Sequence, residues 1–194
     1  MHLFFDLETN GLPKSWFASL YDINNWPRVV QVAWAVYTPE GERKSQKNFI
    51  VYPEDFDISD ESASIHRITT ELARKEGTSL NKVLKEFNTG LDTASTIISH
   101  NIDFDLPSLN AEFARSNVET NLLQKRRFCT MKSEKIISFC NIPNPYYRGC
   151  KWPSLAELHT TLFDTMFEDS HNAGADVEAC AQCYFELRKR GIIQ

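Results

Sequence analysis

The sequence has no apolar stretch that approaches the roughly 18 residues that a membrane-spanning helix requires. Its first residues, Met1-His2-Leu3-Phe4-Phe5-Asp6, contain neither the basic start nor the small-residue cleavage region of a secretory signal peptide. These absences argue against a membrane protein and against a secreted one. We therefore expect no membrane partner, and we take the cytoplasm as the default compartment.

Cysteine is scarce and does not form a framework. The five cysteines are an odd number with no compact spacing, which suits a reducing compartment. Cys180 and Cys183 have a C-x-x-C spacing, but they lie in a helical pattern with no second cysteine or histidine pair nearby. We expect both to be small apolar residues of the core rather than metal ligands or a redox pair.

Positive charge is in the minority, because 21 lysines and arginines stand against 26 acidic residues and the net charge is −5. This balance is a mild argument against a nucleic-acid partner, since non-specific binding depends on Lys and Arg. The basic residues gather in three local clusters, each of which a solvated surface would also explain. The clusters are Lys125-Arg126-Arg127, Arg148 with Lys151, and Arg188-Lys189-Arg190.

The chain also lacks internal repeats, low-complexity tracts and linkers that would divide it. Its 194 residues, 42% apolar and 24% charged, are an ordinary size and composition for one globular domain with a substantial core. We therefore expect residues 1–194 to form a single domain.

Three short segments, far apart in the chain, supply four carboxylates and one histidine: Asp6 and Glu8, then Asp105, then His171 and Asp176. Taken alone, Asp105 is explained as a helix cap and His171 as a structural residue at a helix start. Four converging carboxylates, however, would repel one another unless divalent cations lay between them. Hard oxygen ligands with a nearby histidine are what metal-assisted phosphodiester hydrolysis requires.

The three segments resemble, in order and spacing, the motifs of the DEDDh superfamily of 3′–5′ exonucleases. This superfamily includes bacterial proofreading subunits, ribonuclease T, oligoribonuclease and the TREX-type exonucleases. The first motif, Phe-Asp-x-Glu-Thr-x-Gly, matches residues 5–11, and the other two, Asn-x-x-Phe-Asp and His-x-Ala-x-x-Asp, match residues 101–105 and 171–176. The resemblance therefore spans nearly the whole chain.

This resemblance implies a ribonuclease-H-like fold and a site for two divalent cations, Mg²⁺ or Mn²⁺. It implies that Asp6 bridges both cations, with Glu8 and Asp176 on the water-activating ion and Asp105 on the second. His171 is implied as the general base, since imidazole can accept a proton from metal-bound water at neutral pH. Its position argues against the related subfamily that uses tyrosine.

The resemblance also implies residues that contact the substrate. These are Thr9, Asn10 and Gly11 of the first motif, Asn101 and Phe104 of the second, and the pair Ile65 and His66. The pair lies in a segment that is similar to a family sequence near the terminal nucleotide, Ile-His-Gly-Ile-Thr, but Arg67 replaces its glycine. His100 is expected to hold the second motif in place.

Hydrophobic patterning predicts an α/β domain with a mixed central sheet flanked by helices. Because residues two apart on a strand share a face, Asp6 and Glu8 should project together. Asp105 is expected at the N-cap of the helix 106–115, with Pro107 in its first turn, and Asp176 near the start of the last helix. The expected strands are 2–7, 29–37, 48–52, 96–99 and 127–130; the expected helices are 70–75, 79–91, 106–115, 133–140, one beginning after Ser154, and 172–190.

Two aromatic stretches allow two interpretations. One contains Trp16, Phe17, Tyr21 and Trp26, and the other contains Tyr146, Tyr147, Arg148, Lys151 and Trp152. Both could hold a single strand, since bases stack on such rings at about 1–3 kcal/mol each. Both could equally pack loops onto the domain, and Trp152-Pro153 has the character of a packing pair.

These patterns together predict an active, metal-dependent 3′–5′ exonuclease. Single-stranded or frayed DNA is the expected substrate, and RNA 3′-end processing of the ribonuclease T or oligoribonuclease kind is the alternative. A catalytically inactive nucleic-acid-binding domain is a third reading, but all five expected catalytic residues are present. Because the chain has no tail like the one that tethers proofreading subunits to a polymerase, we expect a stand-alone nuclease. The sequence leaves the oligomeric state open.

Overall fold

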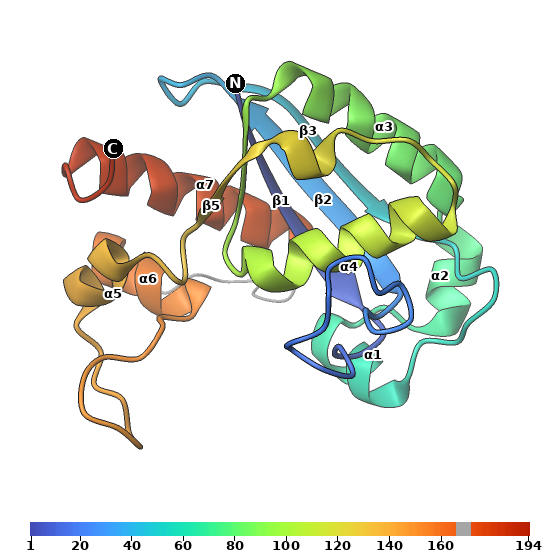
Figure 1. The fold of residues 1–194 in the computed structure, drawn as a ribbon, viewed down its shortest axis with the longest axis horizontal. Coiled ribbons are helices and arrows are strands. Elements are labelled where there is room, and N and C mark those ends of the chain that lie inside the picture. The colour runs from blue at the N-terminus through green and yellow to red at the C-terminus, as the bar shows by residue number, and fades with distance from the viewer. Residues whose placement is uncertain (166–171) are drawn as a thin grey trace.

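The centre of the molecule is a five-stranded mixed sheet, seen in a computed structural model that describes residues 1–165 and 172–194 (Figure 1). The strand order is β3-β2-β1-β4-β5. β1 is antiparallel to β2 and parallel to β4, β2 is antiparallel to β3, and β4 is parallel to β5. The expected mixed α/β architecture is confirmed. The strands are β1 His2–Thr9, β2 Val29–Tyr37, β3 Arg43–Ile50, β4 Thr96–Ser99 and β5 Arg126–Cys129.

Side-chain alternation along β1 divides the core into two layers. Leu3, Phe5 and Leu7 pack on one face of the sheet, whereas Phe4 packs on the other. The first layer lies under helices α3 (Leu80–Thr93) and α4 (Ile102–Arg115). The second lies under α5 (Glu134–Cys140), α6 (Leu155–Phe163) and α7 (Ala173–Lys189), and Figure 1 shows α7 behind the sheet and α3 and α4 in front.

The helix patterns read from the sequence correspond to buried faces. The apolar stripe of α3 and the apolar side of α7 are buried, and Cys180 and Cys183 are buried free thiols in the α7 layer, as expected. At the start of α6, which begins after Ser154 as expected, the Ser154 hydroxyl accepts from the Glu157 N–H, and the Glu157 carboxylate accepts from the Ser154 N–H, so the two residues form a capping box.

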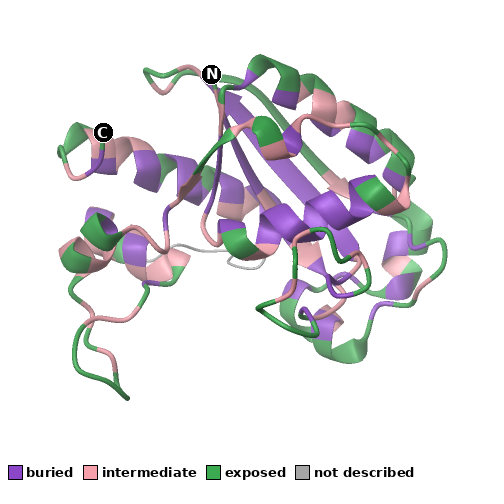
Figure 2. Cartoon of the chain, in the orientation of Figure 1, coloured by how far each residue is buried: buried purple, intermediate pink, exposed green. Residues whose placement is uncertain are grey.

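The third strand differs from its prediction, because it runs from Arg43 to Ile50 rather than from residue 48 to 52. Most of its residues are exposed and polar, so no apolar alternation announces them (Figure 2). It is the edge of the sheet, where charged side chains such as Arg43, Lys44 and Lys47 protect an unpaired strand from further pairing.

The start of α4 was also predicted wrongly. The helix begins at Ile102, so Asp105 lies in its first turn and Asn101 takes the N-cap position. Pro107 therefore lies inside the helix and lacks the N–H that would bond the Asp103 carbonyl. Asp103 is exposed, so water can satisfy that oxygen.

Two short helices connect β3 to α3, and the sequence predicted only the second of them. α1 (Asp60–His66) begins at Ser59, whose hydroxyl accepts from the Ser62 N–H, and α2 (Thr70–Glu76) follows. Arg67 ends α1 with φ of 62°, the left-handed conformation that glycine adopts most easily. This conformation accounts for the glycine in the similar family segment, and it shows that Arg67 is accommodated there.

A single 3₁₀ turn, η1 (Leu122–Gln124), precedes β5. Within the described ranges, no helix combines the length and the apolar character that crossing a bilayer requires.

Candidate active site

The first two candidate ligands lie at the carboxyl end of the central strand. Asp6 and Glu8 follow Phe4 on the β1 face that α7 covers, as their two-residue spacing predicts. Asp6 is opposite Ala33 and Glu8 opposite Gln31 on β2, and the pairing shifts after Glu8. The strand thus carries an apolar core residue and then two carboxylates in the same direction.

The third candidate ligand comes from the opposite end of the sequence, and the start of α7 positions it. The Asn172 side chain caps α7 by accepting from the Gly174 N–H at 3.0 Å, and the Ala173 N–H donates to Gln31 Oε1 at 3.3 Å. A Cβ on Gly174 would lie 2.7 Å from Asn48 Nδ2, so glycine permits this close approach of α7 to β3. The first turns of α7 thereby place Asp176 over β1.

Asp6, Glu8 and Asp176 converge on a common point. One carboxylate oxygen from each lies within 4.8 Å of those of the other two. Such a set of hard oxygen donors matches the ligand preference of Mg²⁺, Mn²⁺ or Ca²⁺. The three residues therefore fit a divalent cation.

Asp105 approaches the same place from the other face of the sheet. It is buried in the first turn of α4, and its carboxylate accepts a hydrogen bond from the Ser99 hydroxyl at the end of β4. A cavity of about 430 Å³ is lined by all four predicted ligands, Asp6, Glu8, Asp105 and Asp176. The structure thus joins the described parts of all three sequence motifs in one cavity.

The electrostatics of the cluster favour neutralisation. Burial, followed by repulsion from Asp105, Asp176 and Glu8, raises the pKa of Asp6 well above its ordinary value. Burial and the neighbouring carboxylates raise the pKa of Glu8 to about 8, and burial is the main cause that raises the pKa of Asp105 to about 7. Bound cations would remove both the repulsion and much of the desolvation cost, so these shifts agree with a metal site.

His100 fixes the second motif, as expected from its position. Burial lowers its pKa to about 4, so the imidazole is neutral. Nε2 lies 3.0 Å from the Pro153 carbonyl, which only accepts, so Nε2 carries the proton and Nδ1 accepts from the Thr130 hydroxyl at 2.9 Å. The next residue, Asn101, lines the cavity, and its buried Oδ1 has no hydrogen-bond partner among the described residues.

A second cavity, of about 450 Å³, shares four lining residues with the first: Leu7, Glu8, Leu12 and Phe104. The predicted substrate contacts Thr9, Asn10, Gly11, Ile65 and His66 also line it. With Asn101 and Phe104 in the carboxylate cavity, the structure brings every described residue of the predicted site to these two adjoining cavities.

Several polar side chains in the second cavity maintain its shape. The Thr9 hydroxyl donates to the Gly11 carbonyl at 2.8 Å, and Asn10 Oδ1 accepts from the Arg28 N–H at 2.9 Å. His66 Nδ1 accepts from the Ile68 N–H at 3.1 Å, which closes the turn around Arg67. We infer that these groups hold the backbone of the cavity walls in position.

One predicted catalytic residue is not placed. His171 lies outside the described residues, so its assignment rests on the sequence alone.

The sequence did not assign to the site several residues that line the carboxylate cavity: Leu12, Met131, Ser154 and Leu155. It also missed the Ser99–Asp105 contact. Ser99 ends the apolar run of β4, so the position of a hydroxyl there was the available signal. The other residues come from loops and helix starts whose approach to β1 is decided by packing.

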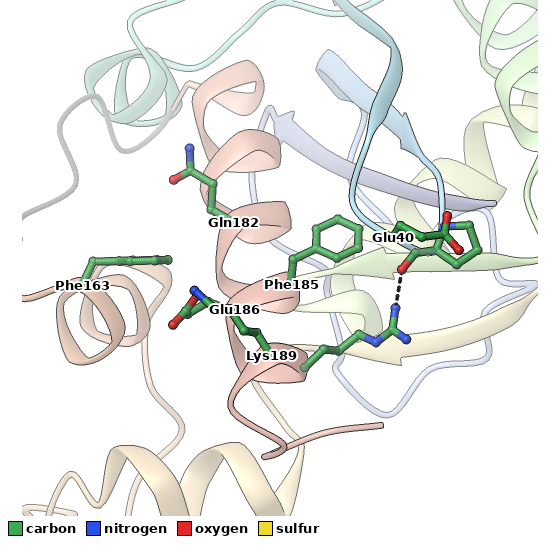
Figure 3. A pocket seen from close by; sticks show the side chains of 8 residues that line it. Glu40, Phe163, Gln182, Phe185, Glu186 and Lys189 are labelled. Carbon is green, nitrogen blue, oxygen red and sulfur yellow. Dashed lines mark hydrogen bonds and ion pairs between the residues drawn. The ribbon is translucent and has the colours of Figure 1, made fainter.

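A larger cavity, of about 600 Å³, lies elsewhere (Figure 3). It is formed by the outer side of α7, Phe163 at the end of α6, and Pro39 and Glu40 after β2. Because β1 and β2 are antiparallel, Pro39 is at the end of the sheet opposite Asp6 and Glu8. Arg188 donates to the Pro39 carbonyl there at 2.7 Å, and none of the four predicted ligands lines this cavity.

Comparison with known proteins agrees with this geometry. The sequence model of a protein family described as exonuclease (RNase_T) matches residues 3–184. A search of curated protein sequences found no match.

Solved structures of exonuclease I share the fold. E. coli exonuclease I in complex with a dA16 oligonucleotide superposes with a TM-score of 0.75 at 19% identity, covering 97% of this chain and 41% of the other. The zinc-bound complex of the E. coli enzyme with single-stranded DNA gives 0.75 at 20% identity, with coverages of 97% and 40%. Exonuclease I from Methylocaldum szegediense gives 0.74 at 17% identity, also with 97% and 40%. The chain thus spans about two fifths of the length of these proteins.

Proposed function

The chain belongs to the exonuclease family, and from this premise we propose that it is a metal-dependent 3′–5′ exonuclease acting on single-stranded DNA. The observation that carries the proposal is the convergence of Asp6, Glu8 and Asp176, with Asp105 in the same cavity. These residues come from both ends and the middle of the sequence, and the fold brings all four carboxylates to one acidic site.

In this proposal the four carboxylates hold two divalent cations, Mg²⁺ or Mn²⁺. Such cations supply an activated water and stabilise charge on the leaving oxygen during phosphodiester hydrolysis. Asp6, Glu8 and Asp176 provide one group of donors, and Asp105, oriented by Ser99, provides a donor from the opposite side. The raised pKa values of Asp6, Glu8 and Asp105 support this role, because these groups need neighbouring positive charge to ionise fully near pH 7.

The second cavity is proposed to receive the terminal nucleotide. Its volume of about 450 Å³ is in the range of small-ligand sites. Leu12 and Phe104 belong to the walls of both cavities, so a nucleotide between them would have its phosphate beside Glu8. Phe104 also offers an aromatic face for a base.

His171 is proposed as the general base on the strength of the sequence motif. A neutral imidazole can take a proton from an activated water near neutral pH. His100 is unsuited to that role, because both of its ring nitrogens are engaged and burial lowers its pKa to about 4.

We also propose that residues 1–194 act as one exonuclease domain. The family match covers residues 3–184, and both core layers pack on the same sheet. Two of the similar E. coli exonuclease I structures are complexes with single-stranded DNA or a dA16 oligonucleotide, which supports DNA as the first substrate to test.

The test is digestion of end-labelled substrates side by side, with Mg²⁺, with Mn²⁺ and with excess chelator. Single-stranded DNA, duplex DNA, short RNA and a covalently closed single-stranded circle would be compared. We expect metal-dependent shortening of linear single-stranded DNA from its 3′ end, slower attack on duplex ends and no cleavage of the circle. Faster digestion of RNA than DNA would favour the exoribonuclease alternative. Cleavage of the circle or digestion from the 5′ end would contradict the proposal.

A further inference from the structure

The loop between β1 and β2 exposes large aromatic side chains beside the active site. We call residues 12–27 the aromatic loop. Phe17 is 99% exposed, Tyr21 71% and Trp16 53%, and Leu12 is exposed as well. Figure 2 shows this loop, next to α4, mostly in the colour of exposed residues. Large apolar side chains grouped on a surface indicate a binding site.

The loop does not need these rings for its own packing. Trp26 is its buried aromatic residue, and the Trp26 Nε1–H donates to the Ser19 carbonyl at 3.0 Å. Asn25 closes the loop by accepting from the Ser15 N–H at 2.8 Å and donating to the Ser15 carbonyl at 3.0 Å. The packing explanation therefore applies to Trp26 but not to Phe17 and Tyr21.

Helix α4 holds the loop by its backbone. Asn110 Nδ2 donates to the Leu20 carbonyl at 3.1 Å. The Arg115 guanidinium donates to three loop carbonyls, those of Ile23, Trp26 and Pro27. These bonds order the main chain while leaving the outward side chains uncovered.

A buried carboxylate supports this attachment. Glu112 Oε1 accepts from Arg28 Nε at 2.9 Å and from the Val29 N–H at 2.9 Å, and it lies 3.3 Å from Arg115 Nη1. Glu112 is thus one fully buried counter-charge for two arginines that flank the loop. Arg28 lies at the end of the loop, and Arg115 lies on α4. A loop fixed in advance loses little conformational entropy when it binds, which favours affinity.

The exposed rings are continuous with the active-site cavities. Gly11 and Leu12 line the second cavity, and Trp16 lines the carboxylate cavity, with its ring 5.9 Å from the ring of Phe104. A strand whose 3′ end lies at the carboxylates can leave past Trp16, where Phe17 and Tyr21 are the next exposed rings of the loop.

We propose that the aromatic loop is a preformed platform on which bases of single-stranded DNA upstream of the scissile bond stack, with Phe17 and Tyr21 as the base contacts. This inference rests on the proposed function. The outward charges of the loop, Lys14 and Asp22, are opposite in sign. Contacts there are therefore made to bases rather than to phosphates, so their contribution should be insensitive to salt.

The experiment compares a long oligodeoxythymidylate with the p-nitrophenyl ester of thymidine 5′-phosphate, which is too short to reach the platform. Phe17→Ala and Tyr21→Ala should each lower kcat/KM for the oligonucleotide about 5- to 100-fold, as loss of one stacked base requires. The effect should appear in KM, hydrolysis of the ester should keep its wild-type rate, and Phe17→Trp should restore the oligonucleotide rate. Tyr52→Ala, an exposed tyrosine outside both cavities, is the matched control.

Binding of fluorescein-labelled oligodeoxythymidylate, measured by anisotropy with Ca²⁺ at several salt concentrations, separates the two proposals. Binding that depends on Phe17 without any nuclease activity would keep the platform and reject the proposed function. Wild-type rates and affinities in Phe17→Ala and Tyr21→Ala would overturn the platform while leaving the nuclease intact. Equal losses on the oligonucleotide and the ester would also overturn it, because they would indicate a disturbed active site.

Discussion

Asp6 is buried beside three other carboxylates, and burial, followed by repulsion from Asp105, Asp176 and Glu8, raises its pKa. If it holds cations, Asp6→Asn should lower kcat by about 10³-fold or more, because metal-based charge stabilisation is worth several kcal/mol and each 1.36 kcal/mol is a tenfold change in rate. The metal-free variant should be as stable as the parent or more so, because one repelling charge is removed. Rates with saturating Mg²⁺ and urea unfolding of the metal-free protein measure the two effects.

The matched control for Asp6→Asn is Asp103→Asn. Asp103 shares the first turn of α4 with Asp105, but it is exposed and pairs with Lys132 at 2.7 Å. It should leave kcat nearly unchanged. A similar loss of kcat in both variants would show that activity requires negative charge near the site in general, and not the four converging carboxylates in particular.

The raised pKa values also predict how the stability of the metal-free protein depends on pH. Folding raises the pKa of Glu8 from 4.5 to about 8 and that of Asp105 from 3.8 to about 7, so the folded state binds more protons than the unfolded state in this range. Stability from these groups is therefore lost as pH rises. His100, whose pKa falls from 6.5 to about 4, acts in the opposite direction only below pH 6.5.

Between pH 6.5 and about 8, the free energy of unfolding of the metal-free protein should therefore fall. Urea unfolding in chelator at several pH values measures this slope. Glu8→Gln should reduce it, and saturating Mg²⁺ should flatten it. A slope that is unchanged in Glu8→Gln would contradict the assignment of the shift to Glu8.

The role of His171 as general base is a prediction that comes from the sequence alone. His171→Ala should lower kcat by about 10²–10⁴-fold, and wild-type rates should fall below about pH 6.5 as the imidazole becomes protonated. When the activity of His171→Ala is measured at increasing metal concentrations, the half-maximal concentration should be nearly the same as for the parent protein. Loss of metal affinity with turnover intact at saturating metal would mean that His171 is a ligand and not a base.

At the scale of elements, the aromatic loop depends on α4, because Glu112 is the buried counter-charge for Arg28 and Arg115. Glu112→Ala should destabilise the protein by about 3 kcal/mol, since Arg115 and Arg28, both largely buried, lose their buried counter-charge and only Arg28 keeps a second carboxylate, the exposed Asp55. Tryptic cleavage after Lys14 should also become faster. Asp57→Ala removes an exposed ion pair with Arg74 and should cost less than about 1 kcal/mol, with no change at Lys14.

Element starts were less predictable than element centres. The apolar stripe of α3 and the buried side of α7 follow from their period, whereas α4 begins a full turn before its predicted start. Pro107 suggested a helix beginning beside it, but the helix begins after Asn101, its N-cap, which lies two residues beyond the end of β4. Burial of the apolar Ile102 side chain stabilises the additional helical turn.

At the scale of the whole molecule, a net charge of −5 must be reconciled with the polyanionic substrate that we propose. We expect kcat/KM on single-stranded DNA to fall linearly with salt on logarithmic axes, with a shallow slope because few cations contact phosphates. Rates on the p-nitrophenyl ester should change less. Substrate titrations from low to physiological salt measure both slopes, and a steep slope would indicate an extended basic groove instead of an acidic, metal-filled site.

The sequence by itself determined the order of the five strands and of every described helix except α1 and η1, the sharing of one face by Asp6 and Glu8, and the candidate ligands, because period and motif are local properties of the chain. Only the tertiary structure decided that Asp105 and Asp176, from helices on opposite faces of the sheet, meet Asp6 at one end of β1. It also decided that Trp26 is buried while Phe17 faces solvent. Both outcomes depend on contacts between segments far apart in the chain, such as Arg115 with the loop carbonyls, and no local pattern encodes them.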